Sequence, residues 1–179
     1  MSDYSISIVP KHSNYQNKES KAKEILEWLI SEDIVKPTIS DCVLGSNMGY
    51  SISAGAKMVT NDPLDLPFDL ITNGLEIITE RNVFHTGENY VDELICPSCK
   101  DDIAFEDWEF DSWIKENTDN MICPLCKSES GIHSYIFRPD WGFSNLGFTF
   151  WNWPTFTDKF IEVFKLKIGC DVSIVYQHI

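Results

Sequence analysis

The segments Cys96-Pro97-Ser98-Cys99-Lys100 and Cys123-Pro124-Leu125-Cys126-Lys127 repeat one pattern, in which two residues separate a pair of cysteines. This gap lets both sulfurs of a turn point at one ion, and two such turns complete a tetrahedral shell of four thiolates. Proline fixes φ inside each turn and suits a tight knuckle. We therefore predict that Cys96, Cys99, Cys123 and Cys126 bind one Zn²⁺. Four protein ligands leave no open position on the metal, so the predicted role is structural and not catalytic.

Two disulfides or two redox pairs are the alternatives to a metal site. The 23 residues between the pairs slightly exceed the usual zinc spacing. A redox Cys-x-x-Cys pair normally occurs once, so two matched copies favour zinc. The N-terminus lacks a basic start followed by an apolar stretch, and no apolar run approaches a membrane span. We expect a cytoplasmic, reducing compartment, which disfavours disulfides.

The segments around the knuckles carry strand and helix patterns. Residues 4–9 alternate and predict a strand, and residues 18–31 carry one apolar helical face with Asn17 available as the cap. Residues 38–66 are rich in glycine and predict loops with a short strand near 50–60. The other predicted elements are a β-rich stretch at 74–84, a helix or two short turns at 104–117, strands at 132–138 and 146–153, a helix that Thr155 caps and Gly169 ends, and a strand at 171–177.

Counting 132–138 and 146–153 as one element leaves the order β-α-β-β-α-β once the knuckles are set aside. This order predicts an α+β fold of ferredoxin-like type, in which two helices cover one face of an antiparallel sheet. We assign residues 1–87 and 132–179 to this core. Residues 88–131 form the predicted inserted zinc-ribbon-like subdomain.

Acidic residues dominate the chain, which has 28 acidic and 14 basic side chains and a formal net charge of −14. Residues 88–130 hold twelve of the acids and only three of the bases. A surface of this sign repels phosphates and anionic lipids, which argues against nucleic acids and membranes as partners. The density of Asp101, Asp102, Glu106 and Asp107 instead predicts contact with a basic protein.

The second half of the chain combines several short motifs. They are the two Cys-Pro-x-Cys turns, Gly87-Glu88-Asn89-Tyr90, Trp141-Gly142-Phe143, Ile168-Gly169-Cys170 and His178. Over residues 84–179 this combination resembles a family of uncharacterised bacterial proteins, with the Gly87 segment a loose match to the family's Gly-Asn-aromatic motif. The resemblance implies a bacterial, soluble, zinc-binding protein and no particular activity. Some members carry a sugar-transport ATPase label, but this chain has no G-x-x-x-x-G-K-[ST] motif to support it.

Aromatic residues and one histidine are candidates for a small-molecule site. His85, near Glu88 in the sequence, could take part in acid–base chemistry, although a lone histidine beside a turn is more often a surface residue. Trp151 and Trp153 are predicted to share one face of the strand at 146–153. They could stack on a sugar if they are exposed, or pack in the core or beneath the knuckles.

The sequence favours a zinc-stabilised, non-enzymatic, acidic module that binds a basic protein. An inhibitor or immunity protein against a basic toxin is one concrete form of this hypothesis. The alternative is an enzyme or a carbohydrate-like small-molecule binder that uses a sheet cleft near His85 or near Trp151 and Trp153. A nucleic-acid-binding zinc ribbon is the least favoured function, because it needs a basic face.

Overall fold

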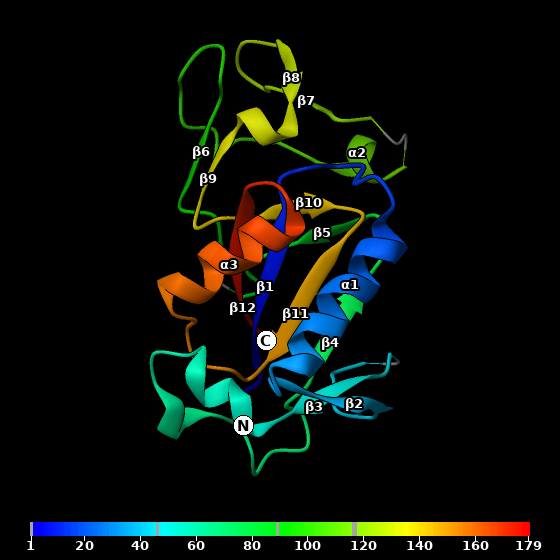
Figure 1. The fold of residues 1–179 in the computed structure, drawn as a ribbon. Coiled ribbons are helices and arrows are strands. Elements are labelled where there is room, and N and C mark those ends of the chain that lie inside the picture. The colour runs from blue at the N-terminus through cyan, green and yellow to red at the C-terminus, as the bar shows by residue number, and fades with distance from the viewer. Residues whose placement is uncertain (1, 46, 89, 116–117) are drawn as a thin grey trace.

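The structure is a computed structural model of the chain and describes residues 2–45, 47–88, 90–115 and 118–179. These residues form a mixed helix-and-sheet structure (Figure 1). The α-helices are α1 (Lys18–Ser31), α2 (Asp111–Lys115) and α3 (Asp158–Ile168), and the 3₁₀ turns are η1 (Ala54–Met58), η2 (Pro63–Asp65) and η3 (Ile132–Ser134). No helix among the described residues has both the length and the apolar character needed to cross a membrane.

The largest sheet has the strand order β12-β1-β11-β4-β3-β2, and every neighbouring pair in it is antiparallel. Strand β1 pairs on one side with β11 and on the other with the edge strand β12, so the first and last strands of the chain lie side by side. The strands are β1 (Tyr4–Pro10), β2 (Val35–Ser40), β3 (Gly49–Ile52), β4 (Leu75–Ile78), β11 (Gly147–Trp151) and β12 (Val172–His178).

One face of this sheet is apolar, and α1 and α3 lie across it (Figure 1). Ile6 and Ile8 of β1 alternate with serines, and they neighbour Phe148 and Phe150 of β11 on the helix-covered face. All four side chains are at most 2 % exposed. Phe164 of α3 completes this packing, with its ring centroid 5.2 Å from that of Phe148. We call this cluster and the strands and helices around it the sheet core.

Helix α3 begins two residues later than the sequence predicts. Thr157 is its N-cap, and the Thr157 hydroxyl accepts a hydrogen bond from the Phe160 N–H at 3.2 Å. Thr155 lies before the helix, and its hydroxyl accepts a hydrogen bond from the Asn61 amide instead. The predicted end is confirmed: Gly169 has a φ of 80°, and its N–H donates to the Lys165 carbonyl at 2.8 Å.

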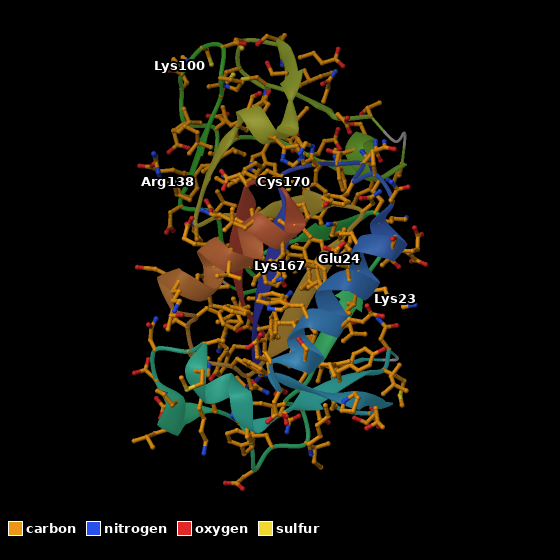
Figure 2. All side chains as sticks on the ribbon, viewed as in Figure 1. Lys23, Glu24, Lys100, Arg138, Lys167 and Cys170 are labelled. Atoms are coloured by element: carbon orange, nitrogen blue, oxygen red, sulfur yellow. The ribbon has the colours of Figure 1, made fainter. Side chains whose placement is uncertain are left out.

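The cysteine turns belong to a separate layer at the top of Figure 1, which we call the knuckle module (residues 91–138). Its short strands form two antiparallel pairs, β6 (Glu93–Ile95) with β9 (Ile136–Arg138) and β7 (Asn120–Ile122) with β8 (Glu129–Gly131). A third pair, β5 (Asn82–Phe84) with β10 (Gly142–Ser144), joins the module to the sheet core. Figure 2 shows Lys100 at the outer end of the module and Arg138 nearer the sheet.

Two predictions about the elements are wrong. The segments 132–138 and 146–153 are not one element, because β9 pairs with β6 in the knuckle module while β11 pairs with β1 in the large sheet. The predicted loop at 38–66 begins too early, because residues 38–40 are the end of the edge strand β2, which also contains Pro37. Proline is compatible with an edge strand because its missing N–H leaves no partner strand unsatisfied.

Candidate metal centre

Each cysteine pair lies in a turn that directly follows a short strand, β6 for Cys96 and β7 for Cys123. The Lys100 N–H donates to the Cys96 carbonyl at 3.1 Å, and the Lys127 N–H donates to the Cys123 carbonyl at 3.0 Å. Both lysines have left-handed backbone, with φ of 67° and 61°. The two turns therefore share one backbone conformation, which aims the sulfurs of each turn in the same direction.

The four cysteine sulfurs lie within 4.8 Å of one another. Cys96 Sγ is 3.8 Å from Cys126 Sγ, and Cys99 Sγ is 3.9 Å from Cys123 Sγ. At a metal–sulfur distance of about 2.3 Å, a tetrahedral zinc site separates its sulfurs by about 3.8 Å. A disulfide would need about 2.05 Å, and all six cysteines are free. The cluster therefore has the dimensions of a closed four-thiolate metal site.

Hydrogen bonds to sulfur lower the pKa of Cys96 and of Cys126, whereas for Cys99 a backbone hydrogen bond from Asp101 is outweighed by burial and the neighbouring cysteines, which raise its pKa to about 12. The Ser98 N–H donates to Cys96 Sγ at 3.4 Å, and the Cys126 N–H donates to Cys123 Sγ at 3.5 Å. The pKa of Cys126 is lowered to about 6, chiefly because the Ser128 hydroxyl hydrogen-bonds to its sulfur. Four adjacent thiolates repel one another, so a bound cation is needed to offset their negative charge.

An apolar cluster supports the turns from below. Cys96 and Cys123 are fully buried, next to Leu94, Met121 and Tyr135. The Tyr135 hydroxyl donates to the Met121 carbonyl at 3.0 Å, which satisfies its polar atom inside the cluster. Cys126 is exposed, so one side of the cysteine cluster is accessible to solvent.

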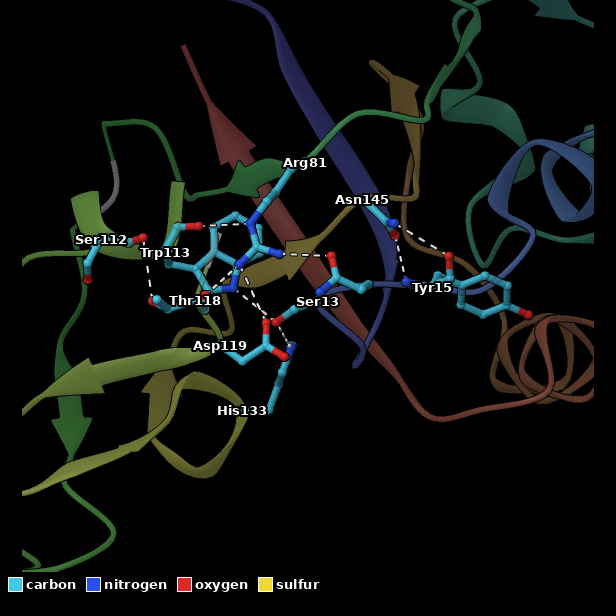
Figure 3. Close-up of polar contacts among 10 residues, drawn as sticks. Ser13, Tyr15, Arg81, Ser112, Trp113, Thr118, Asp119, His133 and Asn145 are labelled. Atoms are coloured by element: carbon cyan, nitrogen blue, oxygen red, sulfur yellow. Dashed lines mark hydrogen bonds and ion pairs between the residues drawn. The ribbon is translucent and has the colours of Figure 1, made fainter. Parts of the chain in front are cut away.

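Arg81 fastens the knuckle module to the sheet core (Figure 3). Its guanidinium stacks 3.9 Å from the Trp113 ring centroid and donates to the carbonyls of Trp113 and Thr118 at 2.8 and 2.5 Å. It also donates to the Asn14 side chain at 3.0 Å, in the segment that follows β1. The Trp113 indole N–H donates to Ser13 Oγ at 2.9 Å, which adds a second buried link. This junction has no signal in the sequence, because none of these residues forms a recognisable motif.

The four predicted acidic residues lie in one exposed loop after the first knuckle. Asp102 has an internal role, because its carboxylate accepts hydrogen bonds from the N–H groups of Leu94 and Ala104, both at 3.0 Å. These two donors lower the pKa of Asp102. Asp101, Glu106 and Asp107 form no ion pair among the described residues.

Phe105 lies in the middle of this acidic loop and is 93 % exposed. The sequence predicts a helix or two short turns over residues 104–117, and the one α-helix described in this segment is α2, which begins after Phe105. Trp108 instead turns inward, and its ring lies 5.6 Å from that of Trp141. The loop therefore combines an uncovered aromatic ring with unpaired carboxylates.

His85 does not contact Glu88, its predicted acid–base neighbour. His85 Nδ1 accepts a hydrogen bond from the Gly87 N–H at 3.0 Å, and partial burial lowers the His85 pKa. The Glu88 carboxylate instead faces His178, with Oε2 at 3.5 Å from His178 Nδ1. Among the residues that the structure describes, no carboxylate forms an ion pair with His85.

The prediction that Trp151 and Trp153 share a face is wrong. Asn152, with a φ of 62°, breaks the alternation, so Trp153 packs beside Phe150 in the sheet core while Trp151 packs on the opposite face. Trp151 is 6 % and Trp153 is 0 % exposed. Each indole N–H has an internal acceptor, Glu76 Oε2 at 3.0 Å and the Asn73 carbonyl at 2.8 Å. They therefore form no exposed aromatic pair.

Trp151 and His85 nevertheless line the same small cavity, together with Glu76. This cavity lies on the face of the large sheet that the helices do not cover.

Comparison of the chain with protein-family models, with curated proteins and with solved structures finds no match.

Proposed function

We propose that the four cysteines bind one structural Zn²⁺ and that the knuckle module so organised presents its acidic loop to a basic protein. The observation that carries the second step is Phe105, which is 93 % exposed between carboxylates. Large aromatic side chains are costly to leave in water and are enriched at the centres of interfaces. The surrounding negative charge selects a partner of opposite sign.

The chemistry of the ligand set supports zinc. Thiolate donors in a closed tetrahedral arrangement suit Zn²⁺ and leave no site for a catalytic water. The acidic loop begins immediately after Cys99, so the metal fixes the base from which Phe105 projects. An inhibitor or immunity protein against a basic toxin is one form that such a binding protein takes.

We also propose that the sheet core is ferredoxin-like. The support is the order in which β1, α1, β4, β11, α3 and β12 follow one another, together with the spatial order β12-β1-β11-β4. The hairpin of β2 and β3 then extends the edge next to β4. The knuckle module occupies the connection between β4 and β11.

Metal analysis tests the first step. Protein purified without chelator should carry one zinc per chain, and Cys96→Ser should lose it, because structural zinc needs all four ligands. Cys170→Ser is the matched control, since Cys170 lies outside the cluster. A purified wild-type protein without metal would overturn this step.

Binding measurements test the second step. The purified chain is used to capture a stoichiometric basic protein from a nuclease-treated lysate of its own source, and the affinity of the purified pair is then measured at low and high salt. Phe105→Ala should weaken binding roughly 30-fold or more, as expected for an aromatic residue at the centre of an interface. Glu106→Gln with Asp107→Asn should weaken it at low salt and remove most of its salt dependence.

Glu19→Gln with Glu27→Gln is the charge-matched control. These exposed carboxylates lie on α1, away from the loop, so the same loss of charge there should leave the affinity unchanged. Affinity that is insensitive to salt and to all of these substitutions would overturn the proposed acidic contact.

A further inference from the structure

The face of the large sheet opposite the helices is polar and yet largely buried. The strand register places Ser7 of β1 beside Thr149 of β11, and Thr149 beside Glu76 of β4. These three side chains are 4 to 7 % exposed. The Ser7 and Thr149 hydroxyls hydrogen-bond to each other at 2.8 Å. This row of side chains across three strands is polar, whereas the row on the other face, under α1 and α3, is apolar.

This row lines a cavity of about 150 Å³. Trp151 forms part of its wall, and β5 contributes Asn82 and Phe84. His85 also lines the cavity and is exposed, so the cavity is connected to the surface on that side. A volume of about 150 Å³ holds a molecule about the size of benzene. The cavity can therefore hold a polar group of five or six non-hydrogen atoms.

Glu76 is the only charged side chain that is buried among the residues the structure describes. Its carboxylate accepts hydrogen bonds from the Asn47 amide at 2.5 Å and from the Trp151 indole at 3.0 Å, and both donors are neutral. Within the described parts of the chain, no lysine, arginine or histidine forms an ion pair with it. Buried charges are normally paired, because an unpaired one loses its hydration without compensation.

We propose that this cavity binds a small organic cation, a monosubstituted guanidinium or ammonium group, with Glu76 as its counter-ion. A carboxylate has lone pairs beyond the two that Asn47 and Trp151 use, so it can accept further hydrogen bonds from a cation. The Ser7 and Thr149 hydroxyls supply more acceptors. Trp151 forms part of the wall beside the Glu76 carboxylate, to which its indole N–H donates. This proposal does not depend on the one for the acidic loop.

No lining residue competes with a cation in the cavity. The lining contains no lysine or arginine, and partial burial lowers the pKa of His85, which disfavours a positive charge on that ring. The other titratable group that faces the cavity is Glu76 itself. A lining with one carboxylate and no lysine or arginine suits a cationic ligand better than an anionic one.

The first test compares two probes of the same shape on the wild-type protein. Methylguanidinium chloride and neutral N-methylurea are titrated at constant ionic strength, and the indole N–H signal of Trp151 is followed by ¹H–¹⁵N NMR. This N–H donates to Glu76 and therefore reports on that carboxylate. We expect a saturable shift with methylguanidinium and none with N-methylurea. Equal responses to the two probes, or no response to either, would overturn the proposal without any need for a variant.

The second test uses matched substitutions. Glu76→Gln should weaken methylguanidinium binding at least ten-fold, whereas Glu80→Gln, which removes the same charge at an exposed position just beyond β4, should leave it unchanged. Unaltered binding to folded Glu76→Gln protein would overturn the role of Glu76. A final arm titrates Nα-acetylarginine amide. Binding of this probe identifies a peptide-borne arginine as the fitting source, and binding of methylguanidinium alone identifies a free small molecule.

Discussion

The sheet core and the knuckle module bury their side chains in different ways. Twenty buried apolar residues form one cluster in the sheet core, between a sheet of long strands and two helices. The cluster around the knuckle module has twelve, of which ten lie within the module and two, Val83 and Phe143, lie on the β5–β10 pair. Two of the ten are the cysteines Cys96 and Cys123. The strands of the module are three residues each and form only two-stranded pairs, which are marginally stable on their own.

This difference indicates what each region needs in order to fold. A core as large as that of the sheet can be stabilised by burial alone, since each fully buried large apolar side chain contributes about 1.5 to 3 kcal/mol. A unit the size of the knuckle module rarely gains more than about 3 to 5 kcal/mol from its core and commonly relies on a metal. The module should therefore lose its structure with its metal, while the sheet core keeps its own.

Cys123→Ser should produce the largest separation between the two regions. It removes one ligand, and structural zinc binding contributes on the order of 10 kcal/mol or more. Hydrogen exchange followed by mass spectrometry should show fast exchange throughout β6 to β9 and retained protection in β1, β11 and β12. Loss of protection in both regions together would contradict the comparison.

Phe164→Ala probes the opposite side of the comparison. Phe164 is fully buried and packs against Trp28, Phe148 and Phe160, so truncation should reduce the free energy of unfolding by about 3 to 5 kcal/mol. The metal content of the folded protein should not change. Leu166→Ala is the control on the same helix, because Leu166 is 81 % exposed and its truncation should have little effect. Denaturant titration measures both, and equal losses would argue against the packing described.

Arg81→Ala tests how strongly the two regions are coupled. It removes the hydrogen bonds to the carbonyls of Trp113 and Thr118 and leaves those groups without their charged donor, at a cost of about 2 kcal/mol. We expect the module to unfold before the sheet core in a denaturant titration that follows metal release and far-UV circular dichroism together. Arg81→Lys keeps the charge but not the planar fork, so it should restore only part of the coupling. Coincident transitions in every variant would show that Arg81 is not the link.

The local parts of the fold were predictable from the sequence. The cysteine spacing predicted the cluster because both turns are short and each is built from consecutive residues. The alternation in β1 and the apolar face of α1 were predictable for the same reason. The end of α3 at Gly169 followed from a single residue with a known backbone preference.

The parts that depend on distant pairing were not predictable. Residues 136–138 have a strand pattern, but nothing in that pattern says that their partner is β6 and not the large sheet. Alternation placed Trp153 on the wrong face because the left-handed Asn152 has no clear signal in the sequence. Glu76 appeared as one polar residue in an apolar strand, and only the register with Thr149 and Ser7 reveals the polar row.

The smallest expected effect concerns the start of α3, where the sequence predicts Thr155 as the N-cap and the structure has Thr157. Thr157→Ala removes the hydroxyl that accepts the Phe160 N–H, so it should lower the free energy of unfolding by about 1 kcal/mol. Thr157→Ser keeps the acceptor and should lower the free energy of unfolding by only a few tenths of the Thr157→Ala effect. The difference between the two variants separates the hydrogen bond from the loss of side-chain packing. Because the buried side chains of α3 belong to the sheet-core cluster, metal release should stay unchanged in both variants. Thr155→Ala is compared in an Asn61→Ala background, which already lacks the Asn61–Thr155 hydrogen bond. If Thr155→Ala destabilised that protein more than Thr157→Ala does, Thr157 would not be the cap.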